Sequence, residues 1–265
     1  VEPLDLRSLA SVREFAERYR GPVDVLVHNA ATLGAAGRLA RTEDGFEECF
    51  QVNYLSTFLL TSLLLDRIER SEAGRIVHVS AKAHEWANIS LDAMVSDKVL
   101  EPGFVRRQSF VMENLGGSYA DSKLAQIMFS SALARRLKPN VVSLSLHPAI
   151  ANTGLTRDLQ ASAALKFLME NVFMRIGRAV GFTQSAEDAP KTQIHVSTHP
   201  ELQKASGRYY SPLSAPLVRC GRPAEDCGVS AVSDLAKDQD MQEGLFRVSC
   251  DLLGLQEGMC DRGRG

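Results

Sequence analysis

Apolar residues follow two different spacings along this chain. A short, nearly continuous apolar run at 23–27 is typical of a strand that is buried on both faces of a parallel sheet. Two further strands are predicted over 75–79 and over 141–146, where apolar and polar residues alternate before the break at His147 and Pro148. Between them, apolar residues recur at helical spacing. These helical patterns cover 8–19, 46–63 and 119–138. Strands that alternate with helices predict right-handed βαβ units, so we expect a doubly wound parallel α/β sheet in one domain spanning 1–265.

The remaining segments complete this scheme. Residues 4–6 resemble the end of a strand, 207–210 a last strand and 241–255 a closing helix. Two further segments, 82–118 and 155–205, follow strand ends. Part of the second segment has apolar residues on nearly every side. Long connections inside compact domains are often functional. We expect these two segments to lie on the substrate side of the fold.

Composition excludes several classes of protein. With 265 residues, a net charge of -2 and a pI near 6.3, the chain has no general attraction to nucleic acid or anionic membranes. Its five cysteines are an odd number without paired CxxC spacing, so we expect reduced thiols rather than a disulfide framework, and no zinc site. No apolar run reaches the roughly 18 residues of a membrane span.

One short segment carries candidate chemistry. Tyr119 and Lys123 lie four residues apart at the start of a helix that we expect to be strongly amphipathic, so they share one face. A nearby cation favours the ionised form of an acid. Lys123 would then lower the pKa of the Tyr119 phenol and make it an acid or base that is usable near neutral pH. Taken alone, the pair is equally a surface tyrosine beside a solvated lysine.

Polar residues also follow the ends of the predicted strands. Asn29, Ser80 and Pro148 lie just beyond three of them. The carboxyl ends of strands in a doubly wound sheet face one crevice, where ligands bind. Asn53 is a polar residue in an apolar helical pattern, where it serves this crevice or is a satisfied structural amide. We therefore expect several separate segments to meet at one site.

Together, these segments resemble the short-chain dehydrogenase/reductase family, and more closely its retinol dehydrogenase-like branch. The resemblance runs almost end to end and rests on several motifs in the family's order. These motifs are 4–6, 28–31, 50–53, 74–80, 119–123, 147–148 with Thr153, and 248–254.

The resemblance implies a Rossmann-like fold and a nicotinamide cofactor, NADP or NAD. Tyr119 would exchange a proton with the substrate oxygen, Lys123 would lower its pKa and hold the nicotinamide ribose, and Asn53 would hold a water of the proton relay. The resemblance also implies further contacts along the cofactor, from its adenine to its nicotinamide. They lie at Asp5, Leu6, Asn29, Ala30, Ala31, Pro148, Ala149, Ile150 and Thr153.

The chain departs from the family pattern at its catalytic serine and at two glycines. The family places this serine as the latter residue of a small pair, where this chain has Ala81. Ser80 stands one position early, so it takes the role through local bending or faces the other way. Ala31 and Ala149 stand where the family usually has glycine.

A third departure concerns the start of the chain. The family's opening strand and glycine-rich turn hold the pyrophosphate, and they have no counterpart before Val1. We therefore expect an N-terminally truncated chain that binds dinucleotide poorly and leaves 23–27 as an exposed edge.

The leading hypothesis is an oxidoreductase that interconverts a hydrophobic alcohol of retinoid, steroid or lipid type and its aldehyde or ketone. Tyr119 would be its acid/base, with Lys123, Asn53 and Ser80 as the other catalytic candidates. The alternative, prompted by Ala81, is a catalytically silent family member or fragment that acts as a binding or scaffold module. The expected partner is a small hydrophobic alcohol or carbonyl compound and not nucleic acid. Any membrane anchor would precede Val1.

Overall fold

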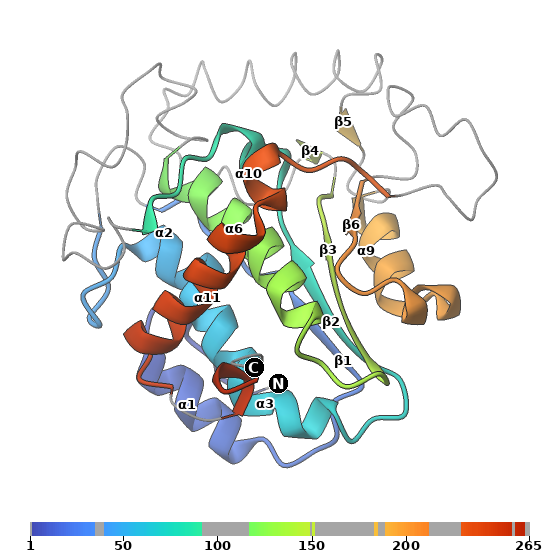
Figure 1. Cartoon of the computed structure of the whole chain (residues 1–265). Helices are drawn as coiled ribbons and strands as arrows, with labels where there is room; N and C mark the ends of the chain where they lie inside the picture. The colour runs from blue at the N-terminus through green and yellow to red at the C-terminus, as the bar shows by residue number, and fades with distance from the viewer. Residues whose placement is uncertain are drawn as a thin grey trace.

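A parallel sheet of four strands lies at the centre of the molecule (Figure 1). The computed structural model describes residues 2–34, 40–91, 117–148, 150–151, 183–184, 189–211, 229–255 and 258–262. The strand order is β1-β2-β3-β6, and every pairing is parallel. The strands are β1 (Val25–His28), β2 (Gly74–Val79), β3 (Val141–Leu146) and β6 (Tyr209–Tyr210). The predicted α/β fold with a parallel sheet is confirmed, and the strands predicted over 23–27, 75–79, 141–146 and 207–210 lie within two residues of the observed ones.

Helices cover both faces of this sheet. α3 (Ser56–Ile68) and α6 (Ser118–Ala134) pack on one face, whereas α9 (Ala189–Thr198) packs on the other (Figure 1). α1 (Leu9–Arg18) lies against α3, and α11 (Gln239–Leu252) lies against α6. The face with α3 and α6 is therefore covered by two layers of helices.

Alternate side chains of the strands supply a hydrophobic core on each face. In β2, Ile76 joins the cluster formed with α3 and α6, while Val77 joins the cluster that contains Val196 of α9. Phe129 of α6 packs against Phe58 of α3, with ring centroids 4.5 Å apart. Because both faces are buried, β2 and β3 have apolar residues toward each helical layer.

The helix predicted over 46–63 contains a π-helical turn. It starts as α2 (Glu48–Phe50), continues as η1 (Gln51–Leu55) and ends as α3. Asn53 lies within η1 and is fully buried. π turns inside helices are frequent at functional sites.

Helix α6 differs from the prediction in its burial. It was expected to be strongly amphipathic, but it buries 14 of its 17 residues because it lies between the sheet and α11. Its polar residues are therefore buried along with its apolar ones. Tyr119 and Lys123 accordingly do not form the solvated surface pair that would be the ordinary reading of their spacing.

Residues 4–6 form no strand in the structure. The Asp5 carboxylate accepts a hydrogen bond from the backbone N–H of Arg7 at 2.9 Å, and Ser56 of α3 donates to the Leu6 carbonyl oxygen at 2.7 Å. No described strand pairs with this segment. The remaining short elements are η2 (Lys82–Trp86), β4 (Ile150–Ala151), β5 (Thr183–Gln184), η6 (Pro200–Lys204), α10 (Asp234–Lys237) and η7 (Gly258–Cys260).

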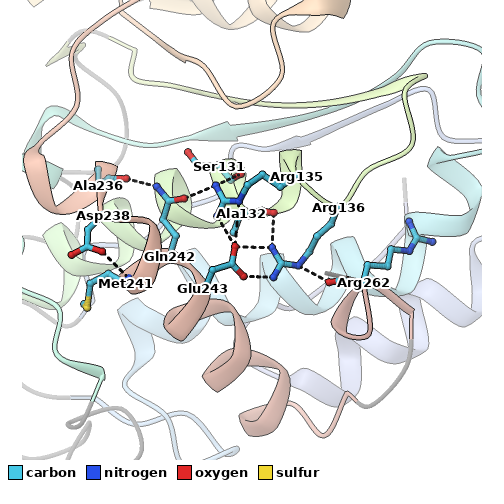
Figure 2. Close-up of polar contacts among 10 residues, drawn as sticks. All are labelled: Ser131, Ala132, Arg135, Arg136, Ala236, Asp238, Met241, Gln242, Glu243 and Arg262. Carbon is cyan, nitrogen blue, oxygen red and sulfur yellow. Dashed lines mark hydrogen bonds and ion pairs between the residues drawn. The ribbon is translucent and has the colours of Figure 1, made fainter. Parts of the chain in front are cut away.

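Ion pairs fasten α11 to α6. Glu243 of α11 accepts hydrogen bonds from Arg135 and Arg136, which follow α6 directly (Figure 2). The Arg136 guanidinium also lies 4.1 Å from the Phe246 ring centre. The guanidinium of Arg262, which follows η7, donates hydrogen bonds to the carboxylate of Glu69 just after α3. The C-terminal part is thereby tied to both helices on its face of the sheet.

A disulfide joins Cys250 of α11 to Cys260 of η7. The expectation of reduced thiols is therefore wrong for this pair, because the chain after α11 folds back and brings the two Cα atoms within 6.1 Å. Cys49 is the free cysteine of the described residues. Within those residues, no helix combines the length and the apolar character that crossing a membrane requires.

Candidate active site

The carboxyl ends of β1, β2 and β3 lie at one edge of the sheet, since these strands are parallel and in register. Asn29 follows β1 and Ser80 follows β2. The first turns of α6 reach the same edge, where Lys123 Nζ donates to the carbonyl oxygen of Val79 at 2.8 Å. The structure thus brings together the segments that sequence reasoning placed at one crevice.

Lys123 directs its ammonium group from α6 to the end of β2. Besides the Val79 carbonyl, Nζ donates to Oε1 of Gln126 at 3.2 Å. Only 2% of Lys123 is exposed, and this burial lowers its pKa to about 8. An ammonium group has three N–H donors. Of these, one has no acceptor among the described residues.

Tyr119 lies in the first turn of α6 and is 7% exposed. Its ring packs with Cys49, Ala83 and Ala120, and Lys123 Nζ lies 5.7 Å from the ring centre. Among the described residues, no hydrogen bond to the phenol oxygen is found.

The pKa of Tyr119 moves in the direction opposite to the one predicted. Burial of the phenol raises its pKa, and the neighbouring Cys49 adds to this rise. The lowering expected from Lys123 is therefore not observed. The physical reason is that burial penalises the phenolate, whereas the ammonium is bound to Val79 and Gln126.

Asn53 joins η1 to the loop after β1 and to α6. Its Oδ1 accepts from Thr32 N at 2.8 Å, and its Nδ2 donates to Thr32 O at 2.9 Å and to Ser122 Oγ at 3.0 Å. Ser122 in turn donates to the backbone carbonyl of Tyr119 at 2.7 Å. Asn53 is thus a satisfied amide that supports the turn carrying the tyrosine. Its role in holding a relay water stays a prediction.

Ser80 and Ala81 differ in their surroundings. Ser80 is 2% exposed, and its hydroxyl donates a hydrogen bond to the Lys123 carbonyl oxygen at 2.7 Å. Ala81 has extended backbone and packs against the cluster that contains Tyr119. The hydroxyl of Ser80 therefore bonds to the helix backbone, while the residue on the tyrosine side has none. A catalytic role for Ser80 stays a prediction.

Sequence reasoning did not find two buried carboxyl groups near the tyrosine. Asp121 is 3% exposed and accepts a hydrogen bond from Asn88 N at 2.8 Å. Burial raises its pKa to about 7, and Glu47 contributes a smaller rise. Burial also raises the pKa of Glu47, which caps the helix by accepting from Cys49 N and Phe50 N. Among the described residues, no cluster of His, Cys, Asp or Glu could hold a metal ion.

Comparison with known proteins gives the family. A family model described as short chain dehydrogenase matches residues 3–98. Human retinol dehydrogenase 12 is 31% identical over 260 residues, which cover 97% of this chain and 70% of that protein. Human retinol dehydrogenase 14 is 32% identical over 259 residues, which cover 96% of this chain and 67% of that protein. The chain belongs to the short-chain dehydrogenase family. It lies in the retinol dehydrogenase-like branch of this family, whose members are NAD(P)-dependent oxidoreductases of alcohols and carbonyl compounds.

Solved structures have the same fold as this short-chain dehydrogenase. An uncharacterised protein from Mycobacterium paratuberculosis has a TM-score of 0.65 and 27% identity, covering 96% of this chain and 75% of that one. A short chain dehydrogenase from Shigella flexneri, solved with NADP, has a TM-score of 0.52 and 18% identity. The match covers 79% of this chain and 73% of that one. At this identity, the second likeness shows the fold alone.

Several predicted cofactor-binding residues of this short-chain dehydrogenase lie at the strand ends. Asn29 and Ala30 are exposed on the loop after β1, and Ala31 beside them is half-buried. Pro148 is half-buried after β3. These residues lie at the same edge of the sheet as Lys123, and their contacts with a cofactor stay predictions.

The other predicted cofactor contacts are placed differently. Asp5 is exposed and Leu6 half-buried on the segment before α1. Ile150 begins β4, and Ala149 and Thr153 lie outside the described residues. Much of the predicted substrate-side segments, 92–116 and 152–182, also lies outside them.

Proposed function

We propose that this short-chain dehydrogenase interconverts a hydrophobic alcohol of retinoid, steroid or lipid type and its aldehyde or ketone, with NADP or NAD. The observation that carries this proposal is the position of Tyr119, which is 7% exposed in the first turn of α6 with the Lys123 ammonium 5.7 Å from its ring centre at the end of β2. The retinol dehydrogenases to which the chain is similar support the substrate class.

The residues at the strand ends fit a nicotinamide dinucleotide. Asn29 and Ala30 are exposed there, and Lys123 keeps one N–H for an acceptor. Asn29 and Ala30 would flank the adenosine ribose, Lys123 would hold the nicotinamide ribose, and Pro148 would border the nicotinamide. When bound, the nicotinamide supplies or accepts the hydride.

Tyr119 acts as the acid in the direction of carbonyl reduction. Because burial raises its pKa, the phenol carries its proton at neutral pH. Reduction of an aldehyde or ketone requires a proton at the substrate oxygen, and Tyr119 supplies it. Oxidation of an alcohol requires the phenolate, which burial disfavours.

Neighbouring side chains hold Tyr119 in place for this step. Asn53 and Ser122 connect its backbone carbonyl to the loop after β1, so the first turn of α6 is fixed relative to β1. The Lys123 ammonium is fixed at the end of β2 in the same way. Such preorganisation keeps the acid and the charge where the reaction requires them.

The test is a substrate panel with the full-length natural protein. All-trans-retinal, decanal and a ketosteroid are assayed with NADPH and with NADH, and acetaldehyde serves as the small polar control. We expect reduction of at least one hydrophobic carbonyl compound, with a kcat/KM well above that for acetaldehyde. Absence of turnover on all three with both cofactors would overturn the proposal.

A further inference from the structure

Gln126 is a fully buried amide that the reaction above does not use. It lies on α6 one turn after Lys123. Its Oε1 accepts from Lys123 Nζ at 3.2 Å, and its Nε2 donates to the Asn53 carbonyl oxygen at 2.7 Å. A single side chain therefore connects two residues that belong to the candidate active site.

The partners fix the orientation of this amide. A lysine ammonium only donates and a backbone carbonyl only accepts. The amide oxygen must therefore face Lys123 and its nitrogen must face Asn53, since the flipped amide would oppose two donors on one side and two acceptors on the other. The bridge between Lys123 and Asn53 thus has a defined direction.

The bridge also occupies the Asn53 carbonyl oxygen. The Thr57 hydroxyl lies 3.3 Å from this oxygen but makes its shorter hydrogen bond, of 2.8 Å, to the Tyr54 carbonyl. A relay water bound to the Asn53 carbonyl would therefore share this oxygen with the Gln126 amide. The link between Lys123 and Asn53 therefore passes through a side-chain amide.

We propose that Gln126 is a positioning residue for Lys123. Its amide oxygen stabilises the charged ammonium, and the bond to Asn53 holds that oxygen in place. The catalytic meaning of this contact rests on the proposed function, but its effect on the ionisation of Lys123 does not. Removing the acceptor should lower the pKa of Lys123, and adding negative charge at the same atom should raise it.

Two substitutions separate these effects. Gln126→Met keeps the length of the side chain and removes both hydrogen bonds. Gln126→Glu keeps an acceptor for Lys123, adds a charge and loses the donor to Asn53. The readouts are the pH profile of kcat/KM and the titration of the Lys123 Cε signal in protein labelled with ¹³C-lysine, assigned with Lys123→Met.

Gln242 of α11 provides a matched control. It is also buried, accepts from Arg135 Nη1 at 2.8 Å and donates to the Ala236 carbonyl at 2.7 Å (Figure 2). It bridges a cation and a carbonyl as Gln126 does, but it lies on a different helix. Gln242→Met measures what the loss of a buried structural amide does to the protein.

The proposal predicts that the alkaline limb of the profile moves up by about one pH unit in Gln126→Glu and down in Gln126→Met. The latter should also lose about tenfold in kcat, and Gln242→Met should keep the wild-type limb. Unchanged limbs and unchanged ¹³C titrations in both Gln126 variants would overturn the proposal. If the wild-type protein has no turnover, the ¹³C titration still decides the role of Gln126, while the proposed function fails separately.

Discussion

Asp121 should make the stability of this protein fall as the pH rises from acidic to neutral. Its ordinary pKa of 3.8 rises to about 7 in the folded protein, with burial as the main cause. In this range the folded state holds a proton that the unfolded state has released, so the free energy of unfolding decreases with pH. The contribution is fully present below about pH 4 and is lost as the pH passes about 7.

The magnitude follows from the difference between the two states. Roughly three pKa units at 1.36 kcal/mol each give about 4 kcal/mol as an upper value. Asp121→Asn removes the ionisation and keeps an oxygen that accepts from Asn88 N. The variant should exceed the wild type by only about 1 kcal/mol near pH 4.5 and by about 2 to 4 kcal/mol at pH 8.

Urea unfolding followed by circular dichroism at pH 4.5, 6, 7 and 8 measures this difference. Asp121→Ala is the companion variant, because it removes both the charge and the hydrogen-bond acceptor. It should flatten the same pH dependence and lie about 1 kcal/mol below Asp121→Asn at every pH. A constant difference between the wild type and Asp121→Asn across the four pH values would refute the reasoning.

Three further outcomes follow from the structure. Burial lowers the pKa of Lys123 to about 8, so its positive charge is lost as the pH rises past this value. In a steady-state pH profile, kcat/KM for carbonyl reduction should therefore decline through about pH 8. Ala81→Ser should increase kcat by about 10² if its hydroxyl reaches the substrate oxygen, whereas Ser80→Ala should mainly lower stability by about 1 kcal/mol; equal kcat for Ala81→Ser and wild type would contradict this. Glu243→Gln should lower the free energy of unfolding by about 1 to 2 kcal/mol in chemical denaturation at pH 7, since Arg136 loses its carboxylate partner, and an unchanged midpoint would count against it.

The sheet could be predicted from the sequence because of how it is buried. β2 and β3 are buried along their whole length and have apolar residues toward both helical layers, which leaves short segments rich in Val, Ile and Leu. The convergence of their ends with α6 follows from parallel strands and needs no further information. The position of the candidate site could therefore be predicted from the sequence, whereas its detailed geometry could not.

The burial of α6 could not be predicted from the sequence in this way. Asp121, Lys123 and Gln126 look like the polar face of an amphipathic helix, but they bind Asn88, Val79 and Asn53, which are far away in the sequence. Periodicity reports which side chains are polar and cannot report partners at such distances. For the same reason, spacing alone predicted the wrong direction for the pKa of Tyr119.

Two local features also depend on long-range structure. The π turn around Asn53 leaves the apolar spacing of its helix almost unchanged, so the sequence pattern does not distinguish it from an α-helix. The disulfide between Cys250 and Cys260 forms because η7 folds back onto α11, and cysteine spacing cannot predict connectivity.

Tyr119→Phe tests the central claim most directly. The substitution removes the hydroxyl alone, and this hydroxyl has no partner among the described residues, so the free energy of unfolding should change by less than about 0.5 kcal/mol. The measurement is single-turnover reduction of retinal by NADPH with the full-length protein at pH 7. The account predicts that the rate falls by about 10² to 10⁴ while stability is retained. A variant that reduces retinal at the wild-type rate would contradict the role of Tyr119 as the proton donor.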